Sequence, residues 1–368
     1  MKIALLALTD RGLATALRIG EGLPGSAIQT VCIHEKALPA GGGQSQEFGK
    51  LQSFRRLSEL VPALWRTHSV LIFVMATGIV LRQIASLIDK KDRDPAVLVL
   101  DEAGKFVIPL LSGHLGGANA WARQIAQQIK AQAVITTATD GRGLVAPDEY
   151  ARRYGWKVEP VDHLPAVNRL LLEQGFLNVF TPYPLNPEQA LVTDSHYRFL
   201  TAQEKDKAQV MLDAFPSEHI REDCLYLVPP VLSVGVGCRR GISCTVILEM
   251  ISSAFKQIGA SPQALSGIYS VDLKAEEAGL VEAAEHLGVP FKTFSAEELQ
   301  TVNEQEHLQR SDFVNKTIGV DGVCEAASLL GANRGRLILP KIKGQGVTVA
   351  ISLENFLSSV LDRETPLI

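Results

Sequence analysis

Cysteine is scarce in this chain, and several common binding motifs are absent. The five cysteines, at positions 32, 224, 238, 244 and 324, are an odd number and form no C-x-x-C pair. This argues against a disulfide framework or a structural zinc site and favours a reducing cytoplasm. The chain also lacks the G-x-G-x-x-G fingerprint of dinucleotide-binding folds and the Lys-Ser/Thr of a phosphate-binding loop. A nucleotide-dependent enzyme is therefore disfavoured.

Long apolar runs and strong charge are also missing. No apolar run approaches the ~20 residues of a membrane span. The apolar start soon reaches Thr9, Asp10 and Arg11 and lacks a small-residue cleavage site, so it predicts a first strand rather than a signal peptide. The net charge is −4; residues 1–140 carry +4, and residues 141–230 and 231–368 carry −4 each. A mildly basic first part fits an anionic small ligand, and we expect neither nucleic acid nor membrane as a partner.

The length and the order of apolar segments predict the architecture. A chain of 368 residues is long enough for two or three domains. Strand and helix patterns alternate, which indicates an α/β fold. We predict two three-layer α/β domains with mainly parallel sheets, residues 1–140 and 231–368, joined by a smaller middle α/β region, residues 141–230. The apolar spacing predicts a helix over residues 51–65. A polar stretch over residues 201–215 is also predicted to be helical.

Small polar residues follow several predicted strands of the first domain. Thr9 and Asp10, then Thr77 and Gly78, come directly after apolar runs, as do residues 112–114 and 136–140. If these strands are parallel, the polar residues meet at one carboxyl edge of the sheet, where open α/β folds bind ligands.

The segment LLSGHLGGAN, residues 110–119, is the centre of this pattern. It joins a predicted strand to a predicted helix, and its glycines let the backbone approach another surface closely. The N–H groups that open the next helix favour an anion. Such a turn also needs glycine for structural reasons, and a single histidine is often a hydrogen-bonded structural residue, so both interpretations stand. The candidate residues here are Ser112, Gly113, His114, Gly116, Gly117 and Asn119.

A second glycine-rich segment, GVGCRRG at residues 235–241, follows a strand in the last domain. Arg239 and Arg240 stand where a helix N-terminus already favours an anion, and arginine binds carboxylates with two hydrogen bonds. The alternative is that both arginines are merely solvated. Cys238 has no identifiable partnering histidine, which disfavours a thiol nucleophile. Ser295 and Glu298 have the spacing of a capping box and are predicted to be helix caps.

Taken together, these segments resemble the CbiG family of anaerobic cobalamin biosynthesis, the cobalt-precorrin-5A hydrolases. The resemblance covers both terminal domains, and the last domain alone resembles a small stand-alone protein of the aerobic pathway. The segments that carry it are MATGIVLR (75–82), DPAV (94–97), VLDEAGKFVIPLLSGHLGGAN (99–119), VITTATD (134–140), GVGCRRG (235–241), VDLKAEE (271–277) and FSAEEL (294–299).

The resemblance implies a hydrolase that opens the δ-lactone of a ring-contracted cobalt tetrapyrrole and releases acetaldehyde, which gives cobalt-precorrin-5B. Cobalt belongs to the substrate, so no cofactor and no protein metal site are expected. Neighbouring enzymes of the pathway and a second copy in a homodimer are further partners that it implies. The alternative is a non-catalytic protein that binds or channels corrinoid intermediates, since glycine loops and arginines serve binding equally well.

Lactone hydrolysis needs a base for water and donors for the developing oxyanion. We expect His114 to be the base, titrating near ~6.5 or lower beside a helix N-terminus. The other expected catalytic residues are Ser112, Asn119 and Asp140. Residues expected to bind the carboxylate-rich substrate are Thr77, Gly78, Arg82, Gly113, Gly116, Gly117, Thr136, Thr137, Gly235, Gly237, Arg239, Arg240, Asp272 and Lys274.

Overall fold

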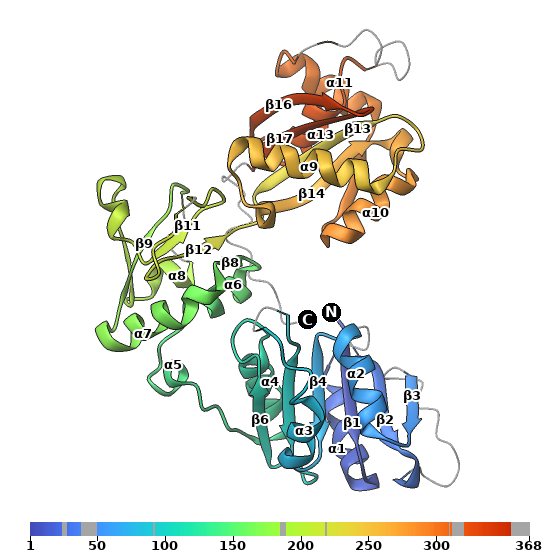
Figure 1. Ribbon diagram of the computed structural model, residues 1–368, viewed down its shortest axis with the longest axis vertical. Helices are drawn as coiled ribbons and strands as arrows, with labels where there is room; N and C mark the ends of the chain where they lie inside the picture. Colours follow the sequence, from blue (N-terminus) through green and yellow to red (C-terminus); the bar gives the residue numbers. More distant parts are fainter. Residues whose placement is uncertain are drawn as a thin grey trace. The chain divides into compact units, whose positions relative to one another are not determined.

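The computed structural model describes residues 1–23, 28–37, 50–90, 93–184, 189–217, 219–308, 310 and 320–354. The chain divides into two compact units. The first comprises Met1–Arg153 and Asn168–Gly175, and the second comprises Tyr154–Val167 and the described residues from Phe176 onward. Three sheets with helices beside them confirm the α/β class (Figure 1). The division into three parts at residues 140 and 230 stays a prediction. None of the described helices is long and apolar enough to cross a membrane.

The first unit contains a seven-stranded sheet in the order β3-β2-β1-β4-β5-β6-β7. Strands β1, β4 and β5 are buried along their whole length, because their apolar runs lie between two layers of helices. The strands are β1 (Ile3–Ala7), β2 (Ile28–His34), β3 (Lys50–Phe54), β4 (Val70–Val74), β5 (Ala96–Leu100), β6 (Phe106–Leu111) and β7 (Gln132–Ala133). The helices are α1 (Asp10–Glu21), η1 (Glu35–Ala37), α2 (Leu57–Thr67), α3 (Thr77–Ile84), α4 (Ala118–Ile129), α5 (Ala138–Gly141) and α6 (Pro147–Tyr154).

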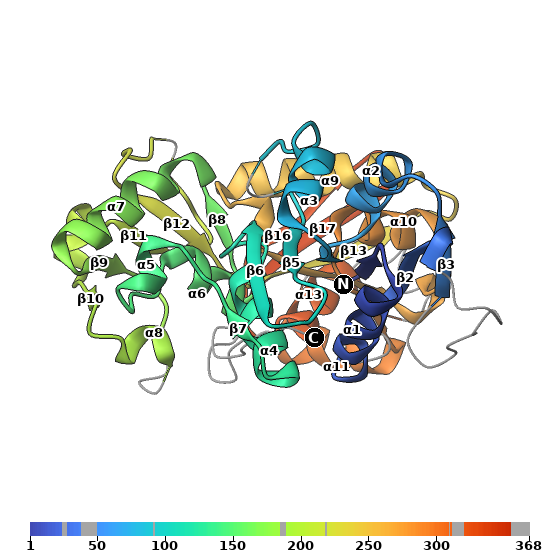
Figure 2. The ribbon, with the colours of Figure 1, turned by 90° about the horizontal axis from the view of Figure 1, so that it is seen from below.

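Both faces of this sheet carry a core. Helices α1 and α4 contribute residues such as Ile19 and Trp121 to one core, and α2 and α3 contribute Leu64 and Ile84 to the other (Figure 2). The helix predicted over residues 51–65 is wrong in its first part: β3 ends at Phe54, and α2 begins only at Leu57. The reason is tertiary pairing, since β3 is held as a parallel neighbour of β2.

The hairpin between β5 and β6 decides where the polar strand ends lie. Asp101 accepts hydrogen bonds from the backbone N–H groups of Lys105 and Phe106, both 2.8 Å, and so closes the turn. Strand β6 then runs antiparallel to β5, with Leu111 beside Val97. All other pairs in this sheet's described strands are parallel. The loop after β6 therefore leaves the sheet at the edge where β5 begins.

The expectation that all polar strand ends share one edge is thus wrong. Thr9 and Thr77 follow parallel strands β1 and β4, whereas residues 112–117 and 136–140 lie at the opposite edge. A five-residue strand separates the two edges by about 17 Å. Thr77, Gly78 and Arg82 therefore lie at the edge of the sheet opposite to that of His114.

The second unit contains two five-stranded sheets. The middle sheet has the order β10-β9-β11-β12-β8, and only its β12–β8 pair is antiparallel. The predicted helix over residues 201–215 is wrong, because that stretch forms a short 3₁₀ helix and then an inner strand. Helix α7 (Leu164–Gln174) crosses the division, since its residues from Asn168 on belong to the first unit. The other elements are β8 (Lys157–Glu159), η2 (Val161–His163), β9 (Leu177–Phe180), α8 (Ala190–Thr193), β10 (Tyr197–Phe199), η3 (Ala202–Lys207), β11 (Val210–Leu212) and β12 (Leu225–Val228).

The third sheet, in the order β15-β14-β13-β17-β16, is mixed: β17 runs antiparallel to both of its neighbours. Helix α13 packs closely on β13 at Gly235, where an added Cβ would lie 1.8 Å from the Cys324 carbonyl oxygen. The elements are β13 (Leu232–Cys238), α9 (Cys244–Ile258), η4 (Pro262–Ala264), β14 (Leu265–Val271), η5 (Asp272–Lys274), α10 (Ala278–Leu287), β15 (Phe291–Phe294), α11 (Ala296–Gln305), α13 (Cys324–Gly331), β16 (Arg336–Gly344) and β17 (Val347–Leu353).

Candidate functional site

His114 lies in the loop that joins β6 to α4. The loop is closed by two backbone hydrogen bonds, from Ala118 N–H to the Ser112 carbonyl at 3.1 Å and from Asn119 N–H to the Gly113 carbonyl at 2.9 Å. Gly117 precedes α4 with φ of 82°, a left-handed conformation that favours glycine. The sequence thus folds this loop back on the start of α4, which brings Asn119 beside it.

Two carboxylates flank the His114 ring. Its Nε2 lies 3.1 Å from an oxygen of Asp140, and its Nδ1 lies 3.4 Å from an oxygen of Asp148. Asp140 is in α5 and Asp148 is in the first turn of α6. All three side chains are buried, with 8–9% of their surface exposed. We call His114, Asp140 and Asp148 the His114 cluster.

Asp140 is the most heavily hydrogen-bonded member. Its Oδ2 accepts hydrogen bonds from the Asn119 amide at 2.9 Å, from the Thr137 hydroxyl and from His114, and its Oδ1 accepts one from Arg123. Burial alone would raise the pKa of Asp140, but the bonds from Thr137, His114 and Arg123 outweigh it and hold that pKa below its usual value. Asp140 is therefore a fixed anion.

The pKa of His114 moves in the direction opposite to the one expected from the sequence. Burial lowers it, but the hydrogen bonds and negative charges of Asp148 and Asp140 are stronger together and raise it to about 9. His114 is consequently an imidazolium at neutral pH, with both N–H groups directed at carboxylates. In this state it can donate a proton but cannot accept one.

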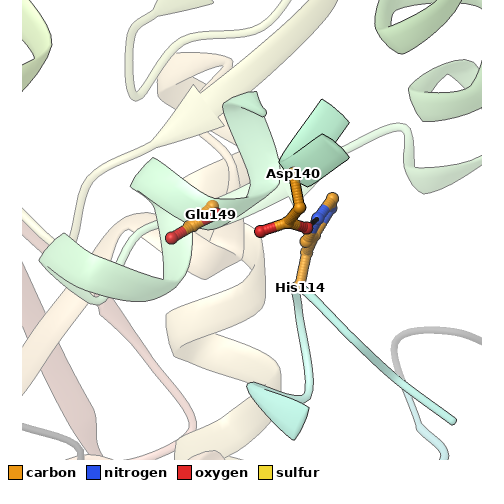
Figure 3. Close-up of side chains that lie close together, drawn as sticks. All are labelled: His114, Asp140 and Glu149. Atoms are coloured by element: carbon orange, nitrogen blue, oxygen red, sulfur yellow. Dashed lines mark hydrogen bonds and ion pairs between the residues drawn. The ribbon is translucent and has the colours of Figure 1, made fainter. Parts of the chain in front are cut away.

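Glu149 lies close to His114 and Asp140, and all three side chains are of types that bind metal ions. One ligand atom from each of His114, Asp140 and Glu149 lies within 4.8 Å of the others (Figure 3). However, Oδ2 of Asp140 already accepts three hydrogen bonds, and Oδ1 faces the positive guanidinium of Arg123. These contacts favour an acid–base cluster over a cation site.

The remaining residues predicted around the loop have structural contacts. The Ser112 hydroxyl donates to the Asp94 carbonyl at 3.1 Å, which anchors the loop to the start of β5. An added Cβ at Gly116 would lie 2.5 Å from that of Ser112, and one at Gly113 would lie 2.9 Å from the Asn119 amide oxygen. Thr136 lies next to Thr137 in the segment between β7 and α5. At the other edge, Arg82 donates to the Gly78 carbonyl of its own helix at 2.9 Å.

The second unit brings other predicted residues together around a cavity of about 920 Å³. Gly237, Arg239, Arg240 and Lys274 all line it. Gly235 does not, because it lies within β13 under α13. Asp272, at the start of η5, does not line it either.

Some residues of both groups were not singled out by sequence reasoning. Asp148 and Arg123 are ordinary in their local patterns, a helix start and a helix surface, and no sequence signal relates them to His114. Lys341 and Lys343 also line the cavity, and their spacing of two on a strand places them on one face of β16. This alternation along the strand is the sequence signal that could have identified Lys341 and Lys343.

Comparisons with known proteins cover nearly all of the chain. Three family models match: "Cobalamin synthesis G N-terminal" over residues 59–140, "Cobalamin biosynthesis central region" over 145–229, and "Cobalamin synthesis G C-terminus" over 232–352. The "Cobalt-precorrin-5A hydrolase" of Priestia megaterium is 30% identical over 367 residues, covering 95% of this chain and 94% of the relative. The protein of that name from Salmonella typhimurium strain LT2 is 32% identical over 360 residues, covering 95% and 97%. "Protein CobE" of a Sinorhizobium species is 32% identical over 123 residues, covering 33% of this chain and 79% of that protein.

Proposed function

This chain belongs to the CbiG family of cobalamin-biosynthesis proteins, and from that premise we propose that it is a hydrolase acting on cobalt-precorrin-5A. Similarity over 95% of the chain to two proteins of that name carries the choice of substrate. The reaction is the opening of the δ-lactone of a ring-contracted cobalt tetrapyrrole, followed by carbon–carbon cleavage that releases acetaldehyde and leaves cobalt-precorrin-5B. Cobalt arrives with the substrate, and the reaction needs no other cofactor.

The His114 cluster supports the first stage. When water adds to the lactone carbonyl and the ring C–O bond breaks, the departing oxygen needs a proton. The His114 imidazolium, with a pKa of about 9, holds that proton at neutral pH. Asp140 holds the ring through Nε2 at 3.1 Å, and the longer contact of Nδ1 with Asp148, at 3.4 Å, leaves Nδ1–H as the donor to the substrate oxygen. His114 therefore acts as an acid here, in place of the base that the sequence led us to expect.

The same group supports the second stage. The hydroxyl produced by lactone opening must lose its proton for the carbon–carbon bond to break in a retro-aldol step. His114, neutral after the first stage, is then the nearest base, and accepting that proton restores the imidazolium. The proton thus cycles between His114 and one substrate oxygen, and the electron pair of the broken carbon–carbon bond passes to the macrocycle.

Asp148 keeps an unused acceptor in this cluster. Its Oδ1 is buried and receives no hydrogen bond from the described residues. A buried acceptor without a partner is costly unless a bound water or ligand group satisfies it. We assign this oxygen to the attacking water, whose proton it would accept and later pass to the macrocycle when the carbon–carbon bond breaks.

The alternative is a protein that binds or channels the corrinoid without changing it, and the cationic cavity of the second unit fits that function equally well. Anaerobic incubation of the purified chain with cobalt-precorrin-5A separates the two. We expect acetaldehyde in equal amount to the substrate consumed, and a corrinoid whose mass equals substrate plus water minus acetaldehyde. His114→Asn should slow the appearance of both signals about 10²–10⁴-fold, and His286→Asn, at an exposed position of α10, is the matched control. Binding without acetaldehyde in the unaltered chain would support the alternative.

A further inference from the structure

The cavity of the second unit is bordered by four segments that lie far apart in the sequence. They are the end of β13 with the loop after it, η5, residues 322–324 at the start of α13, and the hairpin between β16 and β17. Five cationic side chains line the cavity, namely Arg239, Arg240, Lys274, Lys341 and Lys343. No carboxylate other than that of Glu277 forms an ion pair with any of them among the described residues, and Glu277 pairs with Lys274 alone, at 2.6 Å. Four positive charges are therefore left for an anionic ligand.

Two carboxylates, of Glu277 and Glu325, hold these segments in place. Glu277 accepts a hydrogen bond from the backbone N–H of Gly241 at 2.6 Å as well as the one from Lys274. It thereby ties the loop of the two arginines to η5. The buried Glu325 of α13 accepts a hydrogen bond from the backbone N–H of Lys341 in β16, at 3.0 Å. The cations are thus presented by a preformed frame, which lowers the cost of ordering them on binding.

An apolar side chain stands among these charges. Leu273 lines the same cavity and is 71% exposed. A volume of about 920 Å³ is at the upper end of what small-ligand sites offer, about 300–1,000 Å³. Cations that surround an exposed leucine in a large cavity match a flat apolar ring with several carboxylates on its rim. A small anion would match the charges but leave the leucine and most of the volume unused.

We propose that this cavity binds the tetrapyrrole, with Lys341 and Lys343 taking carboxylates of its rim and Leu273 contacting the face of its ring. The proposal rests on the proposed function for the choice of ligand, but it needs no catalysis. It adds the β16 lysines and Leu273 to the arginines and Lys274 already expected to contact substrate. It also assigns recognition to side chains that are separate from the acid–base chemistry of the His114 cluster.

The test is fluorescence titration of the full chain with uroporphyrin III, a metal-free porphyrin with carboxylates at every outer position. Lys341→Gln and Lys343→Gln should each weaken binding about tenfold, which is about 1.4 kcal/mol, because each removes a charge-assisted hydrogen bond. The matched control is Lys292→Gln, an exposed lysine of β15 outside the cavity lining, which should bind as the unaltered chain does. Unchanged affinity in both β16 variants would overturn the proposal.

Two further arms identify the ligand class. Coproporphyrin III, the same ring with half the carboxylates, should bind more weakly to the unaltered chain and lose less affinity in the lysine variants. Leu273→Ser should weaken both porphyrins by a similar factor, because it removes a contact with the ring itself. Displacement of uroporphyrin III by equimolar inorganic phosphate would overturn the proposal, because it would mark a general anion site.

The outcome is separable from that of the proposed function. His114→Asn should leave uroporphyrin III binding unchanged while it slows acetaldehyde release about 10²–10⁴-fold. If the unaltered chain binds uroporphyrin III through the β16 lysines but yields no acetaldehyde, the hydrolase is refuted and the cavity assignment holds. If acetaldehyde forms but the lysine variants bind and react normally, the cavity assignment is refuted and the hydrolase function holds.

Discussion

The protonation of His114 gives the most quantitative prediction. Its pKa is raised from 6.5 to about 9 by Asp148 and Asp140, against the lowering effect of burial. Each pKa unit corresponds to 1.36 kcal/mol, so the folded state gains about 3 kcal/mol from holding this proton. Because the folded pKa lies above the unfolded one, the gain is complete below about pH 6.5. It is lost as the pH rises through about 9.

Two measurements check this on the same samples. An NMR titration of the His114 ring should give a pKa near 9 in the unaltered chain and a lower value in Asp148→Asn, which removes one negative charge. Urea unfolding of the first unit should show the unaltered chain losing about 3 kcal/mol relative to His114→Asn between about pH 6 and pH 10. His286→Asn should show the same pH dependence as the unaltered chain. A His114 pKa at or below 6.5, or parallel pH dependences for the unaltered chain and His114→Asn, would refute the reasoning.

Two substitutions test the frame of the second unit. Gly235→Ala should prevent normal folding of the third sheet or lower the free energy of unfolding by more than about 4 kcal/mol, because the added Cβ would lie 1.8 Å from the Cys324 carbonyl oxygen. The control is Gly143→Ala, where the added Cβ has open space but φ is 69°. It should lower the free energy of unfolding, measured by thermal unfolding, by only about 1–2 kcal/mol. Ser295→Ala should lower the free energy of unfolding by about 1 kcal/mol, because Ser295 and Glu298 form a capping box at the start of α11. A loss no larger than that caused by replacing an exposed serine outside any helix cap would contradict this role.

The alternation of apolar segments was enough to predict the α/β class. The turn at residues 101–104 was also predictable, since Asp101 and Gly104 suit a hairpin. The consequence of that turn was missed: a hairpin reverses the next strand, so the loop with His114 had to lie at the edge opposite Thr9 and Thr77. Residues 51–65 were mispredicted because pairing of β3 with β2 overrides a local helical spacing.

The chemistry of the site was only partly accessible from the sequence. His114, Asn119 and Asp140 were predicted together and do meet. The charge state of His114 was not predictable, because it depends on Asp148, which the fold brings to the ring from a segment without a recognisable motif. A local argument from the helix N-terminus gave the wrong direction, since two carboxylates at 3.1 and 3.4 Å outweigh a helix dipole.

The central claim is that the His114 cluster catalyses the reaction with His114 as an imidazolium. The most direct test is the rate of acetaldehyde release from cobalt-precorrin-5A in single turnovers, measured against pH in the unaltered chain. We predict a rate that is constant around neutral pH and falls as the pH rises through about 9, with a loss of about 10²–10⁴-fold in His114→Asn at pH 7. A rate that instead rises with pH through about 6.5 and then stays level would mean that neutral His114 is the initial base, and it would contradict the account.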